Sequence, residues 1–124
     1  MAQAQADNRL AEFFQWIATY EGANPDNNNP LDERYYFGGY LPKYGTVRES
    51  PGGFAMFSEL AIGVEYGMTC LREMVLNHPE WDFLDFFNVF APRKDGNNPI
   101  KYSKTVAHEM GTVATANLKS TLNL

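Results

Sequence analysis

The sequence is poor in the residues that build disulfide or metal frameworks. Cys70 is the only cysteine among 124 residues, so a disulfide framework and a four-cysteine zinc site are both excluded. The two histidines, His78 and His108, lie far apart and lack the spacing of metal ligands. No metal or other cofactor is therefore expected, and Cys70 is expected to be a small buried hydrophobic residue.

Long apolar runs and basic residues are also scarce. No uncharged apolar stretch approaches the ~18 residues that a membrane-spanning helix needs, so no membrane span is expected. Ten basic residues against 15 acidic ones give a net charge of −5, which argues against nucleic acid as the main partner. Residues 92–124 are the exception, with five basic and two acidic residues, and suit either solvated helices or an anionic ligand.

The residues that are present indicate a compact globular chain. Apolar residues make up 44% and charged residues 20%, and the length suits one domain spanning 1–124. Residues 1–6 lack the basic and apolar segments of a secretory signal, and we expect them to be disordered. Aromatic residues reach 15%, and many tyrosines fall in turn-rich sequence, as they do in ligand-binding grooves.

The spacing of apolar residues predicts a mostly helical fold. Leu10, Phe13 and Ile17 share one helical face, which predicts a first helix from a cap at Asp7 to about Glu21. Further helices are predicted over 59–77, 80–90, 103–110 and 112–121, with Ser58 and Ser103 capping the first and third of them.

The segment between the first two predicted helices, residues 22–57, is rich in asparagine, proline and glycine, which form turns. A loop of this length is unusual in a compact domain, so short strands are expected within it, over 35–37 and 46–47. The predicted fold class is therefore α+β and mostly helical, with an irregular, short-stranded excursion after the first helix.

Glu21 is the most informative candidate for chemistry. Its spacing from Leu10 puts it near the apolar face of the first helix, at the helix's C-terminal end. Burial and the helix dipole would both raise the pKa of a carboxyl there, as a general acid near neutral pH requires. A side chain that turns outward, or one that caps a neighbouring backbone group, is the alternative interpretation.

Asparagine and tyrosine residues follow Glu21 in the turn-rich segment. Asn28 and Asn29 offer amide groups, and Tyr36 and Tyr40 offer the flat, hydroxyl-tipped rings with which proteins bind sugars. A structural turn and a small satellite core explain the same residues without any ligand.

Several short motifs also occur in a recognisable order. They are Ile-Ala-Thr-Tyr-Glu-Gly over 17–22, Asn-Asn-Pro over 28–30, Gly-Phe-Ala-Met-Phe over 53–57, Ala-Pro-Arg-Lys-Asp-Gly-Asn-Asn-Pro over 91–99, then Tyr102, Val106 and Gly111. Their order resembles small phage and prophage-associated proteins with a lysozyme-like domain, akin to muramidases and soluble lytic transglycosylases. The resemblance covers residues 10–111 and implies cleavage of peptidoglycan.

The resemblance also implies roles for particular residues. Glu21 would be the general acid, Asn28, Asn29 and Tyr102 would border the substrate cleft, and Phe54 and Phe57 would pack beneath them. The chain has Leu31-Asp32 where the family pattern has Gly-Asn, and residues 31–45 depart from that pattern altogether. This departure also suits a phage structural protein that has kept the fold without the chemistry.

The reaction class depends on a second carboxylate. A hydrolysing glycosidase needs one, and Asp32, Glu33 and Glu49 are the candidates, with Asp32 preferred. A lytic transglycosylase needs the acid alone, because a hydroxyl of the sugar attacks. The expected partners are glycan strands and a phage particle or holin-type protein, with the chain in the host cytoplasm or virion and acting at the cell wall. A non-catalytic carbohydrate-binding protein and an unrelated helical interaction protein are the alternatives.

Overall fold

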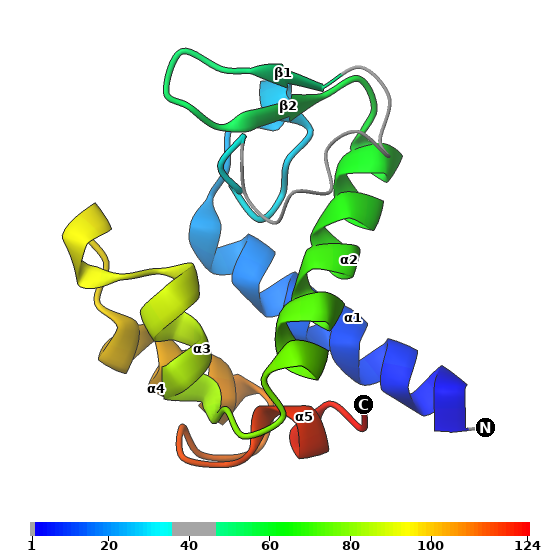
Figure 1. The fold of residues 1–124 in the computed structure, drawn as a ribbon, viewed down its shortest axis with the longest axis vertical. Helices are drawn as coiled ribbons and strands as arrows, with labels where there is room; N and C mark the ends of the chain where they lie inside the picture. Colours follow the sequence, from blue (N-terminus) through cyan, green and yellow to red (C-terminus); the bar gives the residue numbers. More distant parts are fainter. Residues whose placement is uncertain (1, 36–46) are drawn as a thin grey trace. The chain divides into compact units, whose positions relative to one another are not determined.

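A computed structural model describes residues 2–35 and 47–124 of the chain. Within these residues it contains five α-helices and one two-stranded antiparallel sheet, which confirms the predicted α+β, mostly helical class (Figure 1). The elements are α1 (Ala2–Glu21), η1 (Pro25–Asn27), β1 (Val47–Glu49), β2 (Ala55–Phe57), α2 (Leu60–Asn77), α3 (Phe83–Phe90), η4 (Arg93–Asp95), α4 (Pro99–Glu109) and α5 (Leu118–Thr121).

The chain separates into two compact units. The terminal unit comprises Met1–Trp16 and Glu73–Leu124, and the central unit comprises Ile17–Arg72. The sequence alone predicts a single domain over 1–124.

The first two long helices lie close to their predicted positions. Helix α1 ends at Glu21 as predicted, because Gly22 adopts a φ of +57°, the left-handed conformation that ends many helices. It begins at Ala2, ahead of the predicted cap at Asp7, because alanine and glutamine are strong helix formers. Helix α2 ends at Asn77 as predicted and begins at Leu60, one residue after the predicted start.

Helix α3 shows how a local cap sets a helix start. The sequence predicts a start at Glu80, but the helix begins at Phe83. Asp82 accepts a hydrogen bond from the Asp85 backbone N–H at 2.8 Å, and the Asp85 carboxylate accepts one from the Asp82 N–H at 3.1 Å. This reciprocal capping box fixes the first turn and excludes the residues before it.

Two predictions for the C-terminal helices are wrong. Helix α4 begins at Pro99, capped by Asn98, whose side chain accepts from the Lys101 N–H; Ser103 lies inside the helix and donates to the Ile100 carbonyl. Proline at the first helical position is favoured because its missing N–H has no partner there. The helix predicted over 112–121 is confined to α5, since Asn117 caps it at Leu118.

The core of the terminal unit is aromatic. The Phe13 ring meets the rings of Phe83, Phe86 and Phe87 edge-on, with centroids 5.9, 5.1 and 6.2 Å away. All four side chains are fully buried, and edge-to-face packing of this kind adds to the gain from burial. The first and third helices are therefore joined within this unit by apolar contact.

The central unit is built around a hairpin that lies next to a polar loop. Strands β1 and β2 pair antiparallel, with Val47 opposite Phe57 and Glu49 opposite Ala55. The sequence predicts β1 in part but not β2. For the strand predicted over 35–37, pairing occurs one residue earlier, where Arg34 bridges Phe54; residues 36 and 37 lie outside the described residues.

Apolar side chains of the hairpin pack against helix α2. Ala55, Phe57, Tyr66 and Cys70 form a buried cluster, and Cys70 is buried as predicted. The Phe57 and Tyr66 ring centroids are 5.0 Å apart. The central unit therefore has a small core of its own beneath the hairpin.

Candidate functional site

Glu21 occupies the last position of α1, where the chain turns at Gly22 into the polar loop. Its side chain is half-buried. Two effects raise the pKa of Glu21 from 4.5 to about 7. Desolvation by burial is the larger of them, and the negative charge of Asp32 is the second. The predicted direction of the shift is confirmed, and a large fraction of the carboxyl keeps its proton at neutral pH.

Asp32 is the charged neighbour of Glu21 and has an uncommon backbone conformation. Its φ of +55° is left-handed, which aspartate tolerates better than most residues. A turn holds it there, because its N–H donates to the Asn29 carbonyl at 2.9 Å. Burial raises the pKa of Asp32, and the nearby Arg34 guanidinium opposes the rise. The structure thus brings the two predicted catalytic carboxylates, Glu21 and Asp32, into electrostatic contact.

Arg34 lies near the Glu21–Asp32 pair and forms a charged cluster with it, although the sequence does not single this residue out. Its guanidinium lies 4.4 Å from the centroid of the Phe54 ring, and one of its nitrogens donates to the Gly52 carbonyl at 3.1 Å. The cation–π contact and the hydrogen bond fix a positive charge near Asp32. The sequence around Arg34 does not predict these contacts, because Phe54 and Gly52 are distant from it in the chain.

A pocket of about 570 Å³ lies against this cluster. Gly22, which follows Glu21, and Asp32 contribute to its wall, together with loop residues of the hairpin. Its lining residues are Gly22, Ala23, Asn24, Asp26, Asn27, Asp32, Ser50, Pro51, Gly52, Phe54 and Met56. The lining combines carboxylate, amide and hydroxyl groups with an aromatic ring, which is a suitable surface for a polyhydroxylated ligand.

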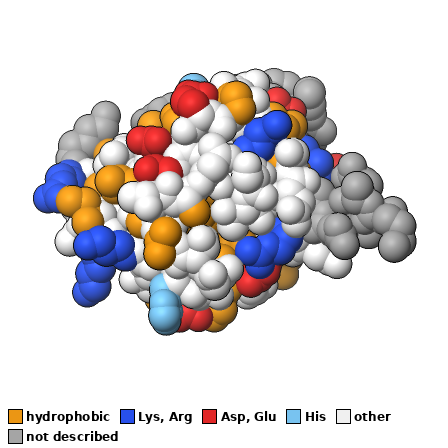
Figure 2. Space-filling view, turned by 90° about the horizontal axis from the view of Figure 1, so that it is seen from below, with side chains coloured by type: hydrophobic (Ala, Val, Ile, Leu, Met, Phe, Trp, Pro, Cys, Tyr) orange, Lys and Arg blue, Asp and Glu red, His pale blue; other side chains and the backbone are white. Residues whose placement is uncertain are grey.

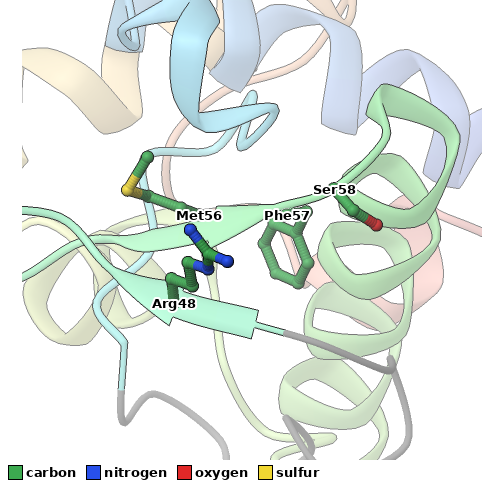
Figure 3. A pocket seen from close by; sticks show the side chains of 4 residues that line it. All are labelled: Arg48, Met56, Phe57 and Ser58. Atoms are coloured by element: carbon green, nitrogen blue, oxygen red, sulfur yellow. The ribbon is translucent and has the colours of Figure 1, made fainter.

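A second pocket, of about 230 Å³, lies along the strands of the same hairpin (Figure 3). Arg48, Met56, Phe57 and Ser58 line it. Arg48 and Met56 are opposite each other in the sheet, so they share one face, and Met56 borders both pockets. The two pockets therefore adjoin at Met56 along the hairpin.

The predicted cleft residues Asn28 and Asn29 have structural hydrogen bonds. The Asn28 amide donates to the Phe57 carbonyl at 2.9 Å, and the Asn29 amide donates to the carbonyls of Glu33 and Ala55 at 2.9 and 3.0 Å. These bonds attach the loop to the hairpin. Gly63 of α2 approaches the same loop so closely that an added Cβ would meet the Asn28 carbonyl oxygen, which explains a glycine there.

The predicted aromatic site residues are only partly described. Tyr36 and Tyr40 lie outside the described residues. Tyr102 belongs to the terminal unit, where its ring stacks on Phe87 with centroids 4.2 Å apart. Phe54 lies under the Arg34 guanidinium and borders the larger pocket, while Phe57 enters the hairpin core.

The other predicted carboxylates differ sharply in exposure. Glu49 lies exposed on β1, whereas Glu33 is buried with only 4% of its surface exposed. Among residues 2–35 and 47–124, no group of three or more histidine, cysteine or acidic side chains is arranged to hold a metal ion.

One face of the molecule carries charged side chains of both signs. Figure 2 shows lysine and arginine side chains on the same face as aspartate and glutamate side chains, with hydrophobic and neutral groups between them. None of the described helices combines the length and apolarity that crossing a membrane requires.

Comparison with protein-family models, with curated protein sequences and with solved structures finds no significant match for this chain.

Proposed function

We propose that the chain is a lysozyme-like enzyme that cleaves the glycan strands of peptidoglycan, with Glu21 as the general acid. A single observation carries the proposal: a carboxyl whose pKa is raised to about 7 ends a helix beside a second carboxylate that borders a 570 Å³ pocket. General acids of glycosidases need this combination of a retained proton and an adjoining substrate pocket.

The chemistry follows from the protonation of Glu21. Below about pH 7 its carboxyl is mostly neutral and donates a proton to the glycosidic oxygen as the C–O bond breaks. In a hydrolase, Asp32 stabilises the positive charge that develops on the sugar or activates the attacking water. In a lytic transglycosylase, a hydroxyl of the sugar attacks, and Asp32 acts only by tuning the pKa of Glu21.

A non-catalytic carbohydrate-binding or phage structural protein on the same scaffold is the second candidate. The observation that favours it is the commitment of the Asn28 and Asn29 amides to backbone carbonyls, which removes donors that a substrate would use. Such a protein would bind glycan through the same pocket without cleaving it.

The decisive variant is Glu21→Gln, which keeps the shape of the side chain and removes the transferable proton. We expect it to lose at least about a hundredfold in the rate of peptidoglycan lysis, within the range for general acids. Its melting temperature at pH 7 should change little, because a neutral amide replaces a desolvated carboxyl that is already partly neutral. The measurement is turbidity loss of purified cell walls.

The matched control is Glu65→Gln, an exposed carboxylate on α2 of the same unit. It should lyse cell walls at the rate of the unchanged chain. Mass analysis of the released fragments identifies the reaction, since anhydro ends indicate transglycosylation and reducing ends indicate hydrolysis. Full activity in Glu21→Gln would remove this residue from the mechanism, and glycan binding without cleavage by the unchanged chain would favour the second candidate.

A further inference from the structure

Glu33 is a buried carboxyl without a normal hydrogen-bond partner. Only 4% of its surface is exposed, and neither carboxylate oxygen has a hydrogen-bond partner of normal geometry among the described residues. Buried ionised carboxylates are strongly unfavourable unless paired, so this geometry favours the neutral acid. The residue is therefore a proton-holding group that the proposed mechanism does not use.

The backbone around Glu33 is tightly held, in contrast to its side chain. The Asn29 side chain accepts from the Glu33 N–H at 3.2 Å and donates to the Glu33 and Ala55 carbonyls. The Ala55 N–H donates to the Glu33 carbonyl at 3.0 Å. We call these bonds between Asn29, Glu33 and Ala55 the Asn29 clamp. Asp32 lies within the turn that the clamp closes.

The groups packed near Glu33 offer no compensating positive charge among the described residues. Helix α2 contributes the Cys70 thiol, whose side-chain hydrogen bond favours the ionised form but is outweighed by burial. The hairpin contributes Ala55, and the loop contributes the neutral Asn29. The sequence neighbours Asp32 and Arg34 are both partly exposed. Burial accordingly raises the pKa of Glu33 to about 8.

We propose that Glu33 is a proton-dependent positioning residue: its neutral carboxyl lets the Asn29 clamp close and hold Asp32 beside Glu21, and loss of the proton opens the clamp. An ionised Glu33 gains free energy by reaching water, and in the proposed switch it reaches water when residues 29–33 leave the hairpin. The clamp thus links the geometry of the Glu21–Asp32 pair to the protonation of a third carboxyl.

The sign of the effect follows from proton binding. The closed form keeps the Glu33 proton up to about pH 8, whereas an open form releases it above the ordinary value of 4.5. Between these values the closed form binds more protons, so opening becomes more favourable as pH rises. Each pH unit in this window should raise the opening constant about tenfold.

The test is amide hydrogen exchange of the full chain across this pH range, followed by NMR. Protection of the Glu33 and Ala55 amides is corrected for the intrinsic pH dependence of exchange. Because Glu21 titrates in the same direction, the comparison is between Glu21→Gln and the double variant Glu21→Gln/Glu33→Gln. For each pH unit, we expect the protection of the clamp amides to fall about tenfold more in Glu21→Gln than in the double variant.

Two controls isolate the clamp. Glu21→Gln/Glu49→Gln removes an exposed carboxylate opposite Ala55 in the sheet and should keep the pH dependence. The Leu118 amide, which donates to the Trp81 carbonyl in the terminal unit, should respond equally in all variants. An unchanged pH dependence in the double variant that carries Glu33→Gln would overturn the proposal.

A second measurement applies even if Glu33→Gln does not fold. In the unchanged chain with ¹³C-labelled glutamate, the Glu33 carboxyl should titrate well above the ordinary glutamate value of 4.5, and the clamp amides should shift with the same midpoint. An ordinary midpoint for Glu33 would refute the proposal. The role in holding Asp32 for catalysis rests on the proposed function, but neither measurement uses a substrate, so failure of lysis leaves clamp opening separately tested.

Discussion

The two units of the chain use their buried surface differently. Among the described residues, Asn27, Asn29, Glu33 and Ser50 are buried polar side chains of the central unit, whereas Ser103 is the one in the terminal unit. The terminal unit instead buries the rings of Phe13, Phe83, Phe86 and Phe87 against one another. The contrast indicates that one unit supplies apolar stability while the other places polar groups at a defined geometry.

The carboxylates with raised pKa values follow the same division. Glu21, Asp32 and Glu33 all belong to the central unit, and burial is the largest cause of each shift. Desolvating three acids in one short stretch opposes folding at neutral pH, because each would ionise in the unfolded chain. A site of this kind is characteristic of functional regions rather than of stable scaffolds.

The largest change in stability is expected in the aromatic core. Phe86→Ala should lower the free energy of unfolding by about 3–5 kcal/mol, since it removes a fully buried ring that contacts Phe13 and Phe87. Chemical denaturation measures it. Val89→Ala on the exposed side of α3 is the control and should change stability little. A small loss in Phe86→Ala would show that the aromatic cluster is not the source of stability in the terminal unit.

A smaller loss is expected at the start of α3. Asp82→Ala removes one half of the capping box and should destabilise the chain by about 1 kcal/mol. Thermal unfolding at neutral pH detects such a change, and the exposed Asn88→Ala in the same helix serves as its control. Equal melting temperatures for the two variants would mean that tertiary packing, rather than the cap, sets the start of this helix.

The smallest effect is expected at Asp32. Asp32→Asn removes the charge that helps to raise the pKa of Glu21, while asparagine tolerates the same left-handed backbone. The NMR titration midpoint of Glu21 should fall below about 7, by less than about one pH unit, because burial is the larger cause. Any pH-dependent lysis should lose its alkaline limb at correspondingly lower pH. An unchanged midpoint would break the electrostatic link between the two carboxylates.

Local sequence signals predict the first two long helices and the position of Glu21 well. The periodicity of Leu10, Phe13 and Ile17 together with Gly22 predicts both the face and the end of α1. The sequence analysis does not predict the start of α4, because it assigns the cap to Ser103, whereas Asn98 caps the helix and Pro99 is its first residue. Strand β2 was missed because its pairing partner lies across a loop, and pairing of this kind is not visible in local periodicity.

The environments of the individual carboxylates in the site are harder to predict from the sequence. Asp32 and Glu33 are adjacent acids that look equivalent in sequence, yet the first borders a pocket and the second is buried. Nothing in the spacing distinguishes them, since a left-handed residue at position 32 redirects the chain between them. Asn28 and Asn29, which are predicted to border a cleft, hydrogen-bond the backbone of the hairpin through their side chains.

By itself, the sequence determined where the first two long helices lie and that Glu21 ends the first of them, because helix periodicity and a glycine stop depend on neighbours within a few turns. Only the tertiary structure decided that Asp32 raises the pKa of Glu21, that Arg34 is fixed on Phe54, and that Glu33 is enclosed by residues as distant as Ala55 and Cys70. Burial and electrostatic coupling are sums over contacts between segments far apart in the chain, and local patterns carry no information about them.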